Sequence, residues 1–133
     1  MRFMLLQNYG EVASGCPPMN EWSPGDIKAH IEFQQTFNDE LLQSGELVDA
    51  QGLAGPEQAK FVVCNGTSAP VITDGPFPES KELLAGYRLI DVESLDRAIE
   101  IAAKASAAPG YNGEPIQDHI EVRQVLSAPD PEV

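Results

Sequence analysis

Residues 73–82 read Thr73-Asp74-Gly75-Pro76-Phe77-Pro78-Glu79-Ser80-Lys81-Glu82, which places an acid, a turn and a charged cluster within ten positions. Gly75 can adopt positive φ at little steric cost, and Pro76 fixes φ and cannot donate a ladder hydrogen bond. We therefore expect the preceding strand to end here. Asp74 should sit at the corner, and Phe77 should turn back toward a core.

The hydrophobic pattern outside this turn predicts an α+β domain. One helix is expected from 26 to 44, ending where Gly45 provides positive φ, and a second is expected to begin after the N-cap Ser94. Strands are expected at 2–8, 47–53, 61–65, 70–73, 86–92 and 120–126. This order predicts a ferredoxin-like sheet with helices on one face and an added hairpin. The other sheet face would need covering, which a homodimer would provide.

Composition restricts the function classes. A length of 133 residues suits one domain, expected at 1–126 and followed by a disordered acidic, Pro-rich tail at 127–133. The net charge of −13, with only eight scattered basic residues, argues against a nucleic-acid partner. No apolar run is long enough for a signal peptide or a membrane span, so we expect a cytoplasmic protein with no membrane partner. Cys16 and Cys64 are expected to be reduced thiols.

The turn stretch closely resembles the DGPF subgroup of the YCII-related family, which has a D-G-P-F-x-E-x-K-E signature. The matching residues are Asp74, Gly75, Pro76, Phe77, Glu79, Lys81 and Glu82. The resemblance extends from about residue 1 to 126 and includes Gly86-Tyr87 and the closing Glu121-Val122-Arg123. It implies a dimeric α+β barrel, which agrees with the homodimer expected from the uncovered sheet face.

A polar row runs along the first predicted helix. The apolar face is expected to comprise Ile27, Ile31, Phe33, Phe37, Leu41 and Leu42. His30, Gln34 and Asn38 follow at i, i+4 and i+8 through the middle of that face. In one interpretation, backbone groups or a wet interface satisfy these side chains. In the other, they line a pocket in which His30 acts as acid or base.

The resemblance adds weight to His30. In better-studied YCII relatives, a histidine on the first helix pairs with an aspartate after the second helix, and Ala29-His30 matches the position of that histidine. Residues 104–110, Lys-Ala-Ser-Ala-Ala-Pro-Gly, offer no such aspartate. Asp74 is therefore the expected substitute, although it could equally serve only as an Asx-type cap of the turn. Glu79, Lys81 and Glu82 could form a solvated cluster or point at the mouth of the pocket.

Two function classes follow from these residues. The first is a cofactor-free lyase or isomerase that moves protons on a small organic molecule. Its expected catalytic residues are His30 and Asp74, and its expected substrate-binding residues are Gln34, Phe37, Asn38, Glu79 and Lys81. The second is a non-catalytic small-ligand-binding or regulatory module, because DGPF-type proteins resemble partners of alternative sigma factors. Two histidines without a suitable ligand spacing do not support a zinc site.

Overall fold

The computed structural model describes residues 1–10, 12–75 and 83–126. Its two helices are α1 (Pro24–Gln43) and α2 (Leu95–Ser106). The strands are β1 (Arg2–Tyr9), β2 (Leu47–Gly52), β3 (Lys60–Val63), β4 (Val71–Asp74), β5 (Leu83–Asp91) and β6 (Ile120–Gln124). Short 3-10 turns lie at η1 (Met19–Glu21), η2 (Pro56–Gln58) and η3 (Tyr111–Gly113). No described helix combines the length and apolar character needed to cross a membrane.

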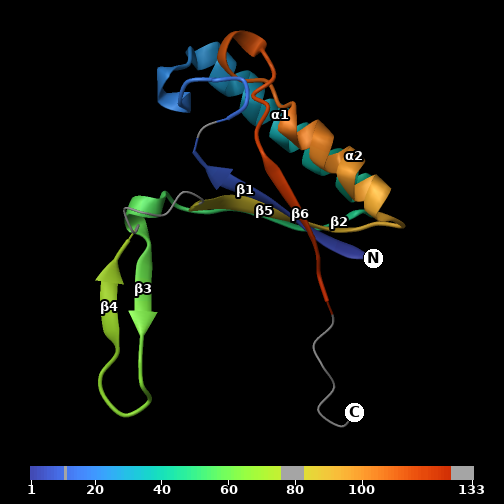
Figure 1. The fold of residues 1–133 in the computed structure, drawn as a ribbon. Helices are drawn as coiled ribbons and strands as arrows, with labels where there is room; N and C mark the ends of the chain where they lie inside the picture. Colours follow the sequence, from blue (N-terminus) through green and yellow to red (C-terminus); the bar gives the residue numbers. More distant parts are fainter. Residues whose placement is uncertain (11, 76–82, 127–133) are drawn as a thin grey trace.

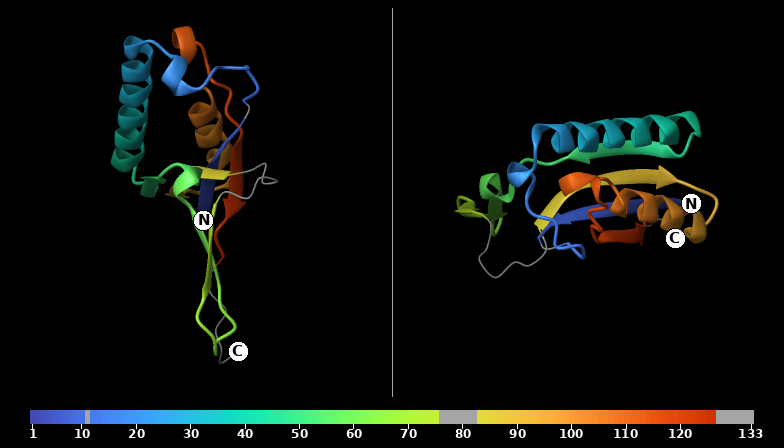
Figure 2. Two further views of the ribbon diagram at one scale, coloured as in Figure 1. Left: turned by 90° about the vertical axis from the view of Figure 1, so that its left-hand side faces the viewer. Right: turned by 90° about the horizontal axis from the view of Figure 1, so that it is seen from above.

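Four strands form an antiparallel sheet in the order β2-β5-β1-β6, while β3 and β4 form a separate two-stranded hairpin. Both helices lie on one side of the four-stranded sheet, and the hairpin projects to the opposite side (Figures 1 and 2). The predicted α+β class is confirmed, and this arrangement is compatible with a ferredoxin-like unit.

The core lies between the helices and one face of the sheet. Alternation along β1 and β5 sends Phe3, Leu5 and Ile90 to this face. They pack with α1 residues Phe37 and Leu41 in one buried cluster. Alanines allow α2 to lie close to the sheet, and its buried residues are Ala98, Ile101, Ala102 and Ala105.

The predicted helix ends are confirmed at Ser94 and Gly45. The Ser94 hydroxyl accepts a hydrogen bond from the Arg97 backbone N–H at 3.1 Å, and Gly45 follows α1 with φ of 80°. Helix α1 begins slightly before the expected boundary, because Ser23 caps it by accepting from the Asp26 N–H.

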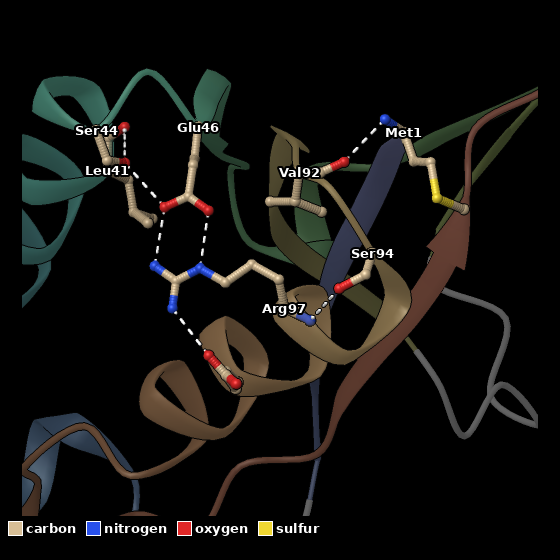
Figure 3. Close-up of polar contacts among 8 residues, drawn as sticks. Met1, Leu41, Ser44, Glu46, Val92, Ser94 and Arg97 are labelled. Atoms are coloured by element: carbon tan, nitrogen blue, oxygen red, sulfur yellow. Dashed lines mark hydrogen bonds and ion pairs between the residues drawn. The ribbon is translucent and has the colours of Figure 1, made fainter.

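An ion pair ties α2 to the connection between α1 and β2. The Arg97 guanidinium donates two parallel hydrogen bonds of 2.8 Å to the Glu46 carboxylate (Figure 3). Ser44 adds a third donor to Glu46 at 2.9 Å. The hydrogen bond from Arg97 is the main cause that holds the pKa of Glu46 below its ordinary value. This fork links α2 to the segment that follows α1.

One part of the predicted apolar face of α1 is wrong. Ile31 is 47 % exposed and Leu42 is 58 % exposed, so neither packs on the sheet. The face toward the sheet combines Phe33, Phe37 and Leu41 with the polar row. Hydrophobicity alone marks Ile31 and Leu42 as core residues, whereas the sheet packs against the side of α1 that carries the polar row, where Arg88 supplies hydrogen bonds.

The expected reason for a glycine at position 75, a positive φ, is wrong. Gly75 does not have positive φ. Instead, a Cβ at this position would lie 2.3 Å from Cε2 of Phe61 and 3.1 Å from Cβ of Ala59. Glycine therefore leaves room for the Phe61 ring and is not needed for a positive φ. The predictions for Phe77, Glu79, Lys81 and the tail at 127–133 lie outside the described residues.

Candidate functional site

The polar row of α1 lines a pocket of about 290 Å³ between the helix and the sheet. His30, Gln34 and Asn38 form one wall, and Gln7, Gly86 and Arg88 of the sheet contribute to the other. Gln7 and Arg88 occupy helix-facing positions of β1 and β5, in register with the core residues Leu5 and Ile90. The pocket is thus built where polar side chains replace apolar ones at core positions.

Arg88 is a buried cation and only 6 % exposed. Its Nε donates to Oδ1 of Asn38 at 2.8 Å, and its Nη2 donates to Oε1 of Gln34. The guanidinium carbon lies 4.8 Å from the centroid of the Phe37 ring, at cation–π distance. Burial lowers the pKa of Arg88, yet no described carboxylate forms an ion pair with it. The pocket therefore carries a positive charge held by neutral acceptors.

These contacts orient the two amides. Because the Gln34 and Asn38 oxygens accept from Arg88, each amide group keeps its two N–H donors for other partners. Arg88 Nη1 has no hydrogen bond within the described residues, and every fully buried side-chain polar atom described does have a partner. Nη1 must therefore be accessible. The pocket presents donors and a positive charge to whatever enters it.

A backbone carbonyl fixes the tautomer of His30. Nδ1 of His30 lies 2.9 Å from the Pro109 carbonyl oxygen, which can only accept, so Nδ1 carries the proton. Nε2 has no hydrogen bond within the described residues. The rings of Trp22 and His30 pack edge to face, with their centroids 5.5 Å apart. Nε1 of Trp22 donates a hydrogen bond to the Pro17 carbonyl at 2.8 Å. A neutral His30 held in this way offers the Nε2 lone pair as a base.

His30 also lines a second, larger pocket of about 700 Å³, so it stands where the two meet. The second pocket is mainly apolar, with walls from Tyr9, Val12, Met19, Trp22 and Ile116. Asp118 lies in this pocket as well, just before β6. A molecule that fills both pockets would pass His30.

Asp118 is a carboxylate that lines the same apolar pocket as His30. The Ser106 hydroxyl at the end of α2 donates to the Asp118 carbonyl at 2.6 Å, and Gln7 Nε2 donates weakly to its carboxylate at 3.4 Å. Burial raises the pKa of Asp118, and the hydrogen bond from Gln7, the backbone and charge of His119 and, least of all, the charge of His30 oppose that rise. An ionised Asp118 would stabilise a positively charged His30.

Asp74 does not join this site in the described chain. It ends β4, is mostly exposed and forms an ion pair with Lys60 across the hairpin. Phe37 is buried beneath Arg88 and supports the pocket from below. The predicted contacts of Glu79 and Lys81 lie outside the described residues.

Sequence reasoning missed Arg88 and Asp118. The sequence could have indicated Arg88, because strand alternation puts it on the same, core-facing side as Gly86 and Ile90. The resemblance suggests an aspartate directly after α2, at 104–110, but the chain first makes the η3 loop, and Asp118 then meets the end of that helix at Ser106. No group of three or more metal-ligating side chains occurs among the described residues.

The fold and site define a small α+β protein with a histidine-containing pocket between its first helix and its sheet. Residues 1–126 match the YCII-related domain, and the chain belongs to that family. An uncharacterised protein of Rhizobium meliloti (strain 1021) is 29 % identical over 102 residues, which cover 77 % of each chain.

Proposed function

We propose that this protein is a cofactor-free enzyme that transfers protons on a small organic molecule, as a lyase or an isomerase does. The observation that supports this most is the fixed tautomer of His30, with Nε2 available where the two pockets meet. His30 Nε2 would take a proton from a C–H bond of the substrate and later return it, to the same or a neighbouring atom. Asp118 takes the role that the sequence had suggested for Asp74, since its charge would stabilise the imidazolium.

Deuterium exchange tests this proposal without knowledge of the substrate. The protein would be incubated in D2O with a panel of small 2-oxo acids and ketones, and loss of the proton next to the carbonyl would be followed by NMR. We expect catalysed exchange for at least one compound, and a loss of about 100-fold or more in His30→Gln. Gln35→Ala is the control, because Gln35 is exposed on α1 and lines neither pocket. Equal exchange by both variants would contradict the role of His30.

The alternative is a ligand-binding or regulatory module without turnover, for instance one linked to an alternative sigma factor. Arg88 favours it, because a preformed cationic pocket can bind an anion without any chemistry. Saturable ligand binding by the wild type, without exchange for any compound in the panel, would support this alternative.

We also propose that the protein is a homodimer, with the helix-free sheet faces of two copies packed together. Alternation places the cross-strand pairs Met4–Leu89 and Leu6–Tyr87 on the face opposite the helices, where they form an apolar centre. The hairpin on the same side exposes Val62, Val63, Val71 and Ile72 by 61–70 %. An isolated two-stranded hairpin is marginally stable, so these side chains favour a second copy as their cover.

A further inference from the structure

We propose that the natural ligand is a monocarboxylic acid with an aromatic or branched apolar body. Its carboxylate would bind at Arg88, and its apolar body would lie beside Trp22. This inference rests on the proposed site at His30 and adds the substrate class. It follows from the different chemistry of the two pockets that meet there.

The smaller pocket is suited to an anion that only accepts hydrogen bonds. Arg88 Nη1 and the amide nitrogens of Gln34 and Asn38 are all donors, and the oxygens of both amides are already occupied. A carboxylate has two acceptor oxygens and no donor, so it can satisfy this arrangement. The buried guanidinium of Arg88, which has no ion pair with a described carboxylate, balances one negative charge, and this favours a carboxylate over a phosphate dianion.

The larger pocket is suited to an apolar group. It is lined by the rings of Tyr9 and Trp22 and by the aliphatic side chains of Val12 and Ile116. Its volume of about 700 Å³ exceeds the size of the anion pocket and leaves room for a ring. Because His30 borders both pockets, a carbon near the carboxylate would lie beside the imidazole, which is the position that proton transfer requires.

Trp22 provides a direct probe, because it is the only tryptophan in the chain and lines the apolar pocket. Its fluorescence would be titrated with phenylacetate, with the neutral analogue 2-phenylethanol, with acetate and with inorganic phosphate. We expect a saturable response to phenylacetate with an affinity at least tenfold higher than for 2-phenylethanol. Acetate and phosphate should leave the emission unchanged at concentrations at which phenylacetate saturates.

Gln34→Glu tests the anion site with almost no change in shape. A carboxylate at this position would pair with Arg88 and repel the ligand, so phenylacetate affinity should fall at least tenfold. Gln35→Glu is the matched control, because it adds the same charge to the next residue of α1 on its exposed side. Asn38→Asp repeats the test from the other contact of Arg88. Thermal unfolding would verify that each variant is folded.

Two results would overturn this inference: equal affinity for phenylacetate and 2-phenylethanol, or no saturable response to phenylacetate. Unchanged phenylacetate binding in both Gln34→Glu and Asn38→Asp would also overturn it. The outcome is separable from that of the proposed enzyme function. Phenylacetate binding without proton exchange supports the ligand class and contradicts the enzyme function. Proton exchange on a neutral ketone, unchanged in Gln34→Glu, supports the enzyme function and contradicts the ligand class.

Discussion

Nδ1 of His30 lies 2.9 Å from the carbonyl oxygen of Pro109, a residue 79 positions away in the chain. This single contact determines which imidazole nitrogen can act as a base. It depends on the path of the loop after α2, in which Gly110 is buried behind Trp22. The loop is therefore part of the site, because its backbone orients His30 and it carries Asp118 into the apolar pocket.

Gly110→Ala should disturb that loop. A Cβ at residue 110 would lie 2.6 Å from Cγ1 of Ile116 and 3.1 Å from Cζ2 of Trp22. We expect destabilisation of about 1–3 kcal/mol, typical of overpacking, together with a change in Trp22 fluorescence. Urea unfolding and emission spectra measure both effects. Gly52→Ala is the control, since nothing lies within 4 Å of its Cβ; equal effects of the two substitutions would contradict this explanation.

Gly75→Ala should destabilise the protein through contact with Phe61, and not through strain of the backbone. We expect a loss of about 1–3 kcal/mol in the free energy of unfolding. The double variant Gly75→Ala with Phe61→Leu should recover part of that loss, because the smaller side chain makes room for the methyl group. A double-mutant cycle from urea unfolding measures the coupling. Strictly additive losses would show that the contact is not the cause.

Asp118→Asn should change how stability depends on pH. Burial raises the pKa of Asp118 in the folded state, so the folded state binds a proton more tightly than the unfolded state does. The contribution of Asp118 to the free energy of unfolding is therefore fully present below the ordinary aspartate pKa. It is lost as the pH rises through the pKa that Asp118 has in the folded state. We expect the stability of Asp118→Asn relative to wild type to increase across that window. Urea unfolding at a series of pH values measures it; a constant or decreasing difference would contradict the prediction.

Glu46→Gln should show the opposite pH dependence. Arg97 lowers the pKa of Glu46, so the contribution of this pair is present above the ordinary glutamate pKa and is lost as the pH falls through the folded value. Arg97 is partly exposed, so we expect a cost of only about 1 kcal/mol at neutral pH. The cost should shrink in acid and at high salt. Glu57→Gln is the control, because no described ion pair involves Glu57; matching pH profiles for the two variants would count against the ion pair.

Leu89→Lys should weaken the proposed dimer. A specific interface is expected to bury about 1,200 Å² or more, and a lysine at the apolar centre would have to be desolvated there. Sedimentation equilibrium at micromolar concentration should give a dimer for the wild type and a shift toward monomer for the variant. Leu42→Lys, which changes an exposed position on α1, should leave the dimer intact. A monomeric wild type would refute the proposal.

Local sequence predicts helix caps and the hairpin, because these depend on neighbouring residues. Ser94 caps α2, and Gly45 follows α1 with positive φ, as predicted. Residues 60–74 form the predicted hairpin. The i, i+4 spacing of His30, Gln34 and Asn38 likewise placed them on one side of α1, and they line one pocket.

The partners of these residues depend on contacts between distant parts of the chain. Arg88 lies 50 residues from Asn38 in the chain, Pro109 lies 79 residues from His30, and Asp118 reaches the site through a loop that returns to Ser106. Sheet order and loop path bring such groups together, and neither is encoded in any local pattern. Asp74 shows the converse: it begins a conspicuous motif, yet the strand pairing of its hairpin places it beside Lys60. A motif specifies local geometry, whereas the composition of a pocket depends on which distant strands pair.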